Sequence, residues 1–433
     1  MSEARAPAPG HEALNPGVAR REVFAWAMYD FANSGYTTVV LTAVFAAYFV
    51  SSVAGNAPWA TFAWTAALSV SYAMVMVAGP LVGAWADAHG AKKKILAATT
   101  LLCIAATVAL AWTAPGMVAW AVVFVIISNF AYAIGENVCA AFLPELARPE
   151  AMGKVSGWGW SLGYFGGLLA LGISLAWVMT AESRGSTTGA AVPGTMIITA
   201  AIFALAVVPT FAWLRERAVP TRAATDVGAA WARLKETLSQ ARRHRDLFTV
   251  FLCGVCYQAG VATVIALAAI YAEQVMGFKT QDTIMLILVV NITAAIGAFG
   301  FGYAQDRIGK VGALRITLFG WIAMVTVSYF SKEQSTFWIA ANLAGLCMGS
   351  SQSAGRALVA YLAPAGRSAE FFGLWGVAIR LAAILGPLTY GAVTWITGGN
   401  HRLAILLTGG FFVLALVVLS QVDEKRGRAA LQP

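Results

Sequence analysis

The sequence predicts an all-α polytopic membrane protein with twelve transmembrane helices. Of its 433 residues, 59% are hydrophobic and 11% are charged, whereas a soluble domain carries about 25% charged residues. The apolar residues come in runs of roughly 20 to 28, and a helix of that length crosses a bilayer at about 1.5 Å rise per residue. The alternative is an unusually apolar soluble protein, which the length of these runs argues against.

Both ends of the chain are expected to be cytoplasmic tails. Residues 1–22 are polar and rich in Pro, Gly and Ala, which predicts a disordered segment. This segment lacks the apolar core and cleavage site of a signal peptide, so the first span is expected to act as an uncleaved insertion signal. Residues 422–433 form the second tail.

Six helices are expected in residues 23–214 and six more in residues 246–421, which gives two six-helix bundles. The expected ranges are 23–50, 60–86, 94–113, 117–142, 155–180, 194–214, 246–275, 281–304, 311–330, 336–361, 369–397 and 400–421.

A basic linker, residues 215–245, separates the two sets. In it Trp231, Leu234 and Leu238 recur at helical spacing among Arg and Lys, which indicates an amphipathic helix on the membrane surface. The plainer interpretation is a covering linker between two halves.

Basic residues set the expected orientation. With the N-terminus inside, nearly all loop Lys and Arg residues fall on the cytoplasmic side, and the opposite side holds only Arg184, Lys279, Lys332 and Arg402. This bias accounts for the net charge of +9 without a nucleic-acid partner. The compact loops and Ala-rich composition favour a bacterial cytoplasmic membrane, with membrane lipids as the surroundings and a monomer as the expected state.

An internal repeat supports the division into two pseudo-symmetric halves. The stretch "GAWADAHGAKKK" follows the second predicted helix, and "GYAQDRIGKVGAL" follows the eighth. The pairs Gly83 and Gly302, Asp87 and Asp306, and Gly90 and Gly309 are each 219 residues apart. Each glycine suits a tight turn or a close helix approach, and each aspartate suits a cap on a neighbouring helix N-terminus. The residues expected to gate movement in these loops are Gly83, Asp87, Lys92, Lys93, Gly302, Asp306 and Arg307.

This doubled motif with six plus six helices resembles the major facilitator superfamily of secondary transporters. The first copy departs from the usual pattern, because Ala88 stands where an arginine commonly follows the aspartate. The stretches "WAMYDFANS", "SGWGWSLGYFGG", "GSSQSAGR" and "EFFGLWG" resemble the vacuole-effluxer-like branch, also called the unknown major facilitator family. Its fungal members are associated with amino-acid export from the vacuole. Gly355 and Ala357 depart from the serines that usually flank the family's arginine.

Polar residues inside the predicted helices mark the candidate site, since a charge at mid-bilayer costs at least about 2.5 kcal/mol. Asp30, Asn33 and Thr37 share one stripe of the first helix, and Tyr29 and Asn33 share an adjoining one. The resemblance places helices 1, 4, 7 and 10 around a central cavity. The residues expected to bind substrate are Tyr29, Asp30, Asn33, Glu136, Asn137, Tyr257, Gln258, Gln352, Arg356 and Arg380.

Each role has an alternative. Asp30 and Glu136 are expected to carry protons, although Asp30 could instead pin the first helix to an arginine or a loop. The planar guanidinium of Arg356 suits a carboxylate or phosphate, while Arg380 could be a gate or a structural ion pair. Packing is expected for the glycines of helices 5 and 11. These glycines are Gly159, Gly163, Gly166, Gly167, Gly373 and Gly376. Aromatic packing is the default for Trp160 and Tyr164, and the alternative is that they face the cavity.

These features predict a secondary transporter that works by alternating access on a small polar metabolite, with an amino acid and export favoured by the resemblance. Proton coupling is a further expectation. All four histidines lie in predicted loops and no phosphate-binding Gly-Lys-Ser/Thr loop is present, so no metal or other cofactor is expected. The alternatives are a membrane enzyme, a non-transporting receptor or scaffold, and a transporter of lipids or apolar compounds.

Overall fold

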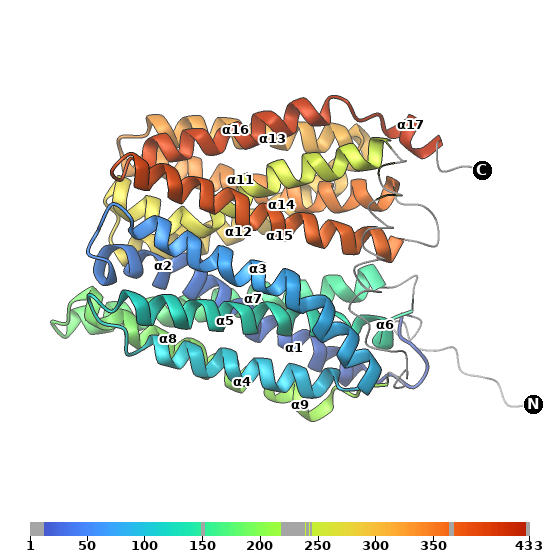
Figure 1. Cartoon of the computed structure of the whole chain (residues 1–433), viewed down its shortest axis with the longest axis horizontal. Helices are drawn as coiled ribbons and strands as arrows, with labels where there is room; N and C mark the ends of the chain where they lie inside the picture. Colours follow the sequence, from blue (N-terminus) through green and yellow to red (C-terminus); the bar gives the residue numbers. More distant parts are fainter. Residues whose placement is uncertain are drawn as a thin grey trace, which may run out of the picture.

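The computed structural model describes residues 13–148, 152–217, 239, 242, 245–362 and 368–429. These residues are almost entirely helical, as the sequence predicts (Figure 1). The helix α1 begins and α16 ends at the same end of the molecule, which is called the terminal end below; the opposite end is called the far end. The amphipathic helix expected in the linker lies outside the described residues.

The twelve predicted spans are confirmed, with ends that differ from the expected ones by a few residues. They are α1 to η2 (Arg20–Val53), α3 (Ala60–His89), α4 (Lys92–Leu110), α5 (Val118–Ala140), α7 (Met152–Ser183), α8 with α9 (Thr188–Ala206 and Val208–Trp213), α11 (Arg245–Met276), α12 (Thr280–Ile308), α13 (Lys310–Phe330), α14 (Gln334–Leu362), α15 (Ser368–Ile396) and α16 (His401–Leu419). Short helices α6 (Leu143–Leu146) and α17 (Glu424–Ala429) follow α5 and α16.

Eleven spans of the described chain are long and apolar enough to cross a membrane by length and composition. The span outside this set is α14, which has 29 residues. Its sequence interleaves amides, serines and an arginine with apolar residues, and these lower its hydropathy. A helix of this composition is tolerated because its polar side faces protein or a cavity rather than lipid.

The first span is not the single continuous helix that the sequence predicts. It runs as α1 (Arg20–Tyr36), the π-helical η1 (Thr37–Ala43), α2 (Phe45–Tyr48) and the π-helical η2 (Phe49–Val53). The backbone of Val44 donates to Val39 at 3.0 Å, five residues back. The β-branched run from Thr37 to Val40 disfavours a regular α-helix at this point, and π-helical turns are frequent at functional sites.

Each half of the molecule repeats the same pairing of helices. In the first half α1 packs on α7 and α3 packs on α5, while in the second α11 packs on α15 and α12 packs on α14. The first half fills the lower part of Figure 1 and the second half the upper part. The two six-helix bundles therefore have the pseudo-symmetric arrangement that the sequence repeat predicts.

Glycines set the closest helix crossings. A Cβ at Gly166 would meet the backbone of Phe31, and one at Gly163 would come within 2.9 Å of the Ser34 hydroxyl, so the packing expected for this part of α7 is confirmed. In α15 the expectation for Gly376 is wrong, because its surroundings are open. Close crossings in α15 lie at Gly386, against the backbone of Ala259, and at Gly391, against the backbone of Phe62.

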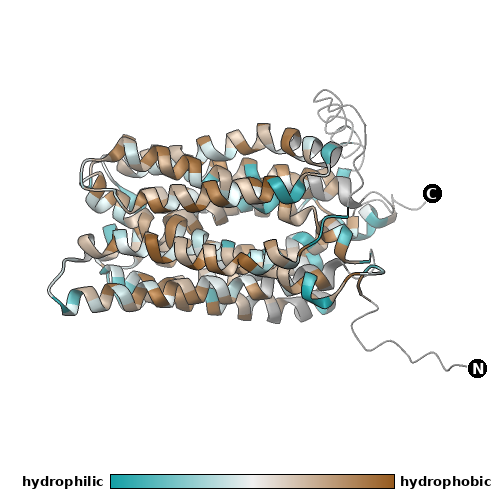
Figure 2. Ribbon diagram, turned by 90° about the horizontal axis from the view of Figure 1, so that it is seen from below, coloured by the Kyte–Doolittle hydropathy of each residue, from teal (hydrophilic) through white to brown (hydrophobic). Residues whose placement is uncertain are grey.

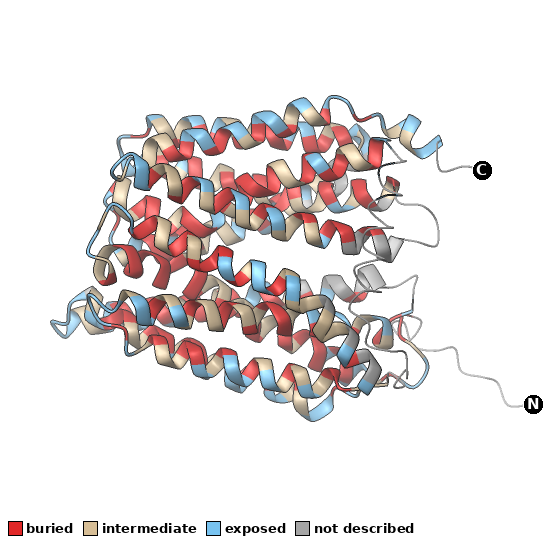
Figure 3. Ribbon diagram, viewed as in Figure 1, coloured by how far each residue is buried: buried red, intermediate tan, exposed pale blue. Residues whose placement is uncertain are grey.

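The surface of the bundle is apolar along the helices and hydrophilic towards their ends (Figure 2). Large side chains such as Leu205, Phe330 and Ile396 are exposed, while the faces turned towards neighbouring helices are buried (Figure 3). Exposed apolar residues of this kind suit a chain that is surrounded by lipid rather than water.

Candidate functional site

A central cavity of about 260 Å³ lies between the two halves. The first half contributes α1, η1 and α7, and the second half contributes helices α11 to α14. Another cavity of about 180 Å³ adjoins it and shares Thr37, Thr42 and Ile265 with it. The π-helical segment η1 therefore lies between two hollows at the interface of the halves.

The residues that line the central cavity differ from those the sequence singled out. All ten expected substrate-binding residues are absent from the described lining. In their place the lining includes hydroxyl, amide and aromatic side chains that are outside those ten: Ser34, Thr37, Thr38, Thr42, Tyr164, Asn291 and Trp321. Thr37 lies on the stripe predicted with Asp30, so helical spacing alone would have found it. Tyr164 lines the cavity and is 37% exposed, so the alternative expectation is confirmed and the default of aromatic packing is wrong.

Four of the expected residues cluster on the terminal-end side of the cavity. Arg380 of α15 crosses between the halves, where its Nη2 donates to Asn137 Oδ1 at 2.8 Å and lies 3.8 Å from Glu136 Oε2. Arg356 of α14 is exposed and interacts electrostatically with Glu136. The cluster joins α5 to α14 and α15, as expected for charges that neutralise one another across an interface.

Asp30 lies beside this cluster and has a different environment. Its carboxylate packs on α7, because a Cβ at Gly159 would come within 2.5 Å of Asp30 Oδ2. It interacts with the like charge of Glu136, and the described residues provide no hydrogen bond or ion pair for it. An arginine that pins Asp30 is therefore absent from the described part of the chain.

The remaining expected residues lie inside the bundles. Tyr29 is 1% exposed, with its hydroxyl 3.4 Å from that of Thr100 on α4. Asn33 is 4% exposed, and its Oδ1 has no hydrogen-bond partner among the described residues. Helical spacing places these side chains on a face but cannot separate a face turned to the cavity from one turned to the bundle core.

The expected site residues of the second half also lie between helices of their own bundle. Gln258 donates to Gln352 at 3.0 Å and Gln352 donates in return at 3.2 Å, so the pair joins α11 to α14. Tyr257 is 1% exposed and packs against Gly355. These three residues pack α11 against α14, the helix that carries Arg356, and they do not belong to the described cavity lining.

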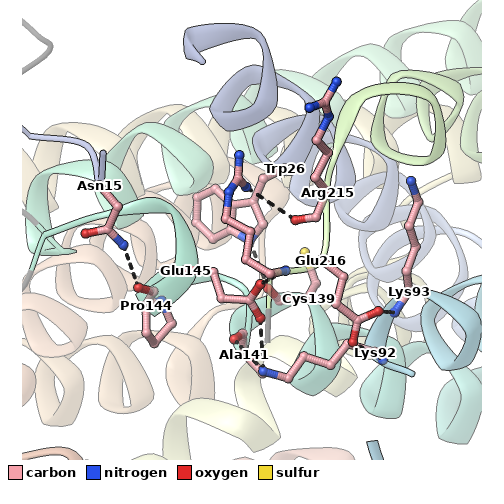
Figure 4. Close-up of polar contacts among 11 residues, drawn as sticks. Asn15, Trp26, Lys92, Lys93, Cys139, Ala141, Pro144, Glu145, Arg215 and Glu216 are labelled. Atoms are coloured by element: carbon pink, nitrogen blue, oxygen red, sulfur yellow. Dashed lines mark hydrogen bonds and ion pairs between the residues drawn. The ribbon is translucent and has the colours of Figure 1, made fainter. Parts of the chain in front are cut away.

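Two of the residues expected to gate movement, Lys92 and Lys93, are bound within their own half (Figure 4). The backbone N–H groups of Lys92 and Lys93 donate to the carboxylate of Glu216 at 2.7 and 3.2 Å, so Glu216 caps the N-terminus of α4. Lys92 Nζ also lies 3.1 Å from Glu145. Arg217 lies 2.8 Å from the buried Glu22 at the start of α1. The cap of α4 thus comes from the end of the sixth span.

The second half repeats this clamp. Glu424 accepts a hydrogen bond from the backbone of Val311, at the start of α13. Arg426 donates to both oxygens of Asp246 in the first turn of α11, at 2.9 and 2.6 Å, and these bonds raise the pKa of Arg426 above its usual value. In each half, a glutamate that follows the sixth span caps the helix of the third span, which is α4 or α13. An arginine one or two residues later forms an ion pair with an acid at the start of the first span, which is α1 or α11.

The other residues of the repeated loop motif are partly described. Gly90 and Gly309 have φ angles of 55° and 79°, which confirms the tight turns. A Cβ at Gly83 would meet nothing within 4 Å, so this glycine does not serve a close helix approach. Arg307 is exposed. The side chains of Asp87 and Asp306, and the surroundings of Gly302, lie outside what the structure describes, as do those of Gly373.

The far end of the molecule joins the halves. Gln274 of α11 donates to Asn56 at 2.7 Å, and Gln281 of α12 donates to Glu182 at the end of α7. Near them Phe62 and Trp395 stack with ring centroids 4.9 Å apart. These contacts close the interface on the far-end side of the cavity.

Two six-helix bundles with a cavity and a charged cluster between them define a transporter of the major facilitator type. The solved structures agree in fold. The nucleoside transporter NupG, as its D323A mutant, has a TM-score of 0.73 at 14% identity and covers 92% of this chain and 98% of its own. A D-xylose-proton symporter has a TM-score of 0.70 at 14% identity and covers 94% and 99%.

The sequence comparisons narrow the class. The model of the vacuole effluxer Atg22-like family matches residues 60–432, and the chain belongs to this family. An uncharacterised MFS-type transporter, YxiO of Bacillus subtilis, is 27% identical over 406 residues, which cover 93% of this chain and 94% of YxiO. Autophagy-related protein 22 of Candida glabrata is 27% identical over 210 residues, which cover 46% of this chain but only 38% of the fungal protein. The family is described as one of effluxers and YxiO as a transporter, which places the chain among transporters rather than enzymes.

Proposed function

We propose that the chain is a secondary active transporter that exports a small polar metabolite bearing a carboxylate, with an amino acid as the favoured class. One observation carries the proposal: Arg380 bridges the two halves onto Glu136 and Asn137, beside Arg356 and next to a cavity lined by both halves. Guanidinium groups bind carboxylates through paired hydrogen bonds. A substrate carboxylate would compete with Glu136 for one of these arginines.

Alternating access would follow from the two-bundle arrangement. The Lys and Arg bias of the loops favours a cytoplasmic terminal end, in the cytoplasmic membrane of a bacterium and with the protein as a monomer. The bonds between Asn56 and Gln274 and between Glu182 and Gln281 lie at the far end. A structure joined at the far end would receive substrate from the cytoplasm, as an exporter requires.

Proton coupling would use the same cluster. Protonation of Glu136 removes the negative charge that attracts Arg380, which weakens the link between the halves. Asp30, which lacks a hydrogen-bond or ion-pair partner among the described residues, is the second candidate for a proton. We infer that proton entry and release of the cross-half link are linked steps.

The test is export from proteoliposomes. Purified protein is reconstituted with a mixed pool of amino acids and small carboxylates, a pH gradient is imposed, and depletion is followed by mass spectrometry. Arg356→Ala and Asp30→Asn are expected to abolish selective depletion, while Arg184→Ala, in an exposed position after α7, is the matched control. If both site variants still deplete the substrate, the proposed site is wrong. If the rate of depletion is the same with and without the pH gradient, proton coupling is wrong.

A lipid or apolar substrate is the second candidate, and a specific observation favours it. Much of the cavity wall is apolar, from residues such as Val264, Ile287 and Met348. An apolar cavity wall suits a hydrocarbon chain or an apolar side chain equally well. If folded protein depletes no solute of the pool, a lipid substrate or a non-transporting receptor role becomes the better account.

A further inference from the structure

We propose that Thr37, Thr38 and Asn291 form an acceptor wall that binds a protonated amine of the substrate inside the central cavity. The inference rests on the proposed transport function and deepens it, because it assigns the group that the cavity recognises. The three side chains line the cavity from both halves. Thr37 and Thr38 come from the π-helical η1, and Asn291 comes from α12.

Both threonine hydroxyls donate their hydrogen to a backbone oxygen of the same helix. Thr37 Oγ1 donates to the backbone oxygen of Ser34 at 3.1 Å, and Thr38 Oγ1 donates to the same oxygen at 2.5 Å. A hydroxyl has one proton and two acceptor lone pairs. After these bonds are made, each threonine can offer the cavity only an acceptor.

Asn291 supplies an acceptor from the opposite half. Its Nδ2 donates to the backbone oxygen of Ile287 at 2.8 Å, one turn earlier in α12. That bond fixes the amide plane and leaves Oδ1 as an acceptor, with one remaining amide proton. Acceptors from η1 and α12 therefore face a cavity that both elements line.

The charge around the cavity favours a cation as the donor. The described residues of its lining include no Lys, Arg or His. Asp30 lies one helical turn before Ser34, and Gly163 of α7 packs against both the Asp30 backbone and the Ser34 hydroxyl. Arg380 faces Glu136, while Arg356 interacts electrostatically with Glu136 and with Tyr164 of the lining, on the α7 side of the cavity. An ammonium group provides three donors and a positive charge, which matches three acceptors and a nearby carboxylate.

The geometry separates the two ends of a zwitterion. The arginine cluster lies on the terminal-end side of the cavity, and the acceptor wall lies deeper between the halves. A substrate with its carboxylate on Arg356 would place its amine towards Asp30 and the acceptor wall. Amine recognition then selects among carboxylates that all satisfy the arginines.

The test uses matched triplets in proteoliposomes of the full chain. Each triplet holds an L-amino acid, its 2-hydroxy acid and the unsubstituted carboxylic acid, on the carbon skeletons of alanine, valine, phenylalanine and glutamate. We expect the wild type to prefer the amine member by about ten-fold or more, the usual effect of hydrogen bonds to a charged group. Thr37→Val and Thr38→Val remove an acceptor at nearly constant shape and are expected to lower this preference several-fold. Asn291→Asp adds a negative charge and is expected to raise it.

Thr326→Val is the matched control. Its hydroxyl donates to its own helix at 2.9 Å, as Thr37 and Thr38 do, but it lies exposed on α13 and outside the described lining. Size-exclusion profiles establish that each variant folds. An amine preference that both valine variants leave unchanged overturns the inference while transport stands. Equal transport of the amine and hydroxy members also overturns it, because the wall would then select any donor. No depletion of any member by folded protein overturns carboxylate transport itself, and the inference with it.

Discussion

At the scale of single residues, Arg380 is the side chain on which the link between the halves depends near the cavity. It combines a hydrogen bond to Asn137 with an electrostatic contact to Glu136, and both acceptors lie on α5. Its own side chain is 21% exposed and that of Glu136 is 38% exposed. The pair is therefore partly open, and a competing carboxylate or a proton can reach it.

Replacement of Arg380 tests this role. Arg380→Gln is expected to lower the transport rate by about ten-fold or more, since a charge-assisted hydrogen bond is lost. Arg380→Lys keeps the charge but not the planar fork, so it is expected to recover part of the rate. The measurement is initial efflux from proteoliposomes at matched protein content. Equal rates for the glutamine variant and the wild type would show that the bridge has no part in transport.

At the scale of elements, the crossing of α1 and α7 depends on the absence of side chains. Gly166 faces the backbone of Phe31, which cannot move aside, whereas Gly172 on the same helix has nothing within 4 Å of a Cβ. This crossing places η1, which continues α1, against α7 and the cavity. The packing of one helix pair thus fixes the position of the acceptor wall.

The two glycines give a matched pair of variants. Gly166→Ala is expected to destabilise the protein by about 1 to 3 kcal/mol, the usual cost of overpacking. Gly172→Ala is expected to be neutral or slightly stabilising, because alanine favours the helix. Thermal unfolding in detergent compares them. Equal melting temperatures would mean that α1 and α7 are not held at the separation the structure gives.

The repeated clamp at the terminal end is the second feature at this scale. Arg217→Ala leaves the carboxylate of Glu22, whose side chain is 5% exposed, without its cation. We expect a loss of about 1 to 3 kcal/mol in the free energy of unfolding, because the arginine itself is partly exposed to solvent.

Adding Glu22→Gln removes the unpaired charge and is expected to restore part of that stability. The same pair of substitutions in the second half, Arg426→Ala and Asp246→Asn, is expected to follow the same order. Thermal melts of the four single and two double variants test both halves together. A double variant less stable than its arginine single variant would contradict the clamp.

At the scale of the whole molecule, the described side-chain hydrogen bonds between the halves lie at the far end, at Arg380, and at Ser69, whose hydroxyl donates to the backbone of Ile384 at 3.5 Å. The pairs Asn56–Gln274 and Glu182–Gln281 join the halves at the far end. A transporter of this type must break such contacts to expose its site to the other side. Contacts between neutral or singly charged side chains suit this purpose, since each contributes only about 1 kcal/mol to 3 kcal/mol.

A disulfide across the far end tests this movement. Cysteines at positions 56 and 274, in a chain whose five native cysteines are replaced, are expected to stop transport on oxidation and to restore it on reduction. Cysteines at 273 and 280, which lie within one half and are hydrogen-bonded at 3.2 Å in the native chain, are the control. Full transport by the oxidised 56–274 pair would contradict opening at the far end.

The sequence by itself determined the twelve spans, the two halves, the tight turns at Gly90 and Gly309 and the glycine-rich face of α7. These features depend on hydropathy and on backbone conformation, which are local properties of the chain. The tertiary structure alone decided which polar residues share a cavity. Helical spacing grouped Asn33 with Thr37, yet Asn33 is buried in the bundle and Thr37 lines the cavity. Glu216 and Glu424 cap helices that begin more than a hundred residues earlier in the chain, and contacts of that kind are set by packing between distant segments.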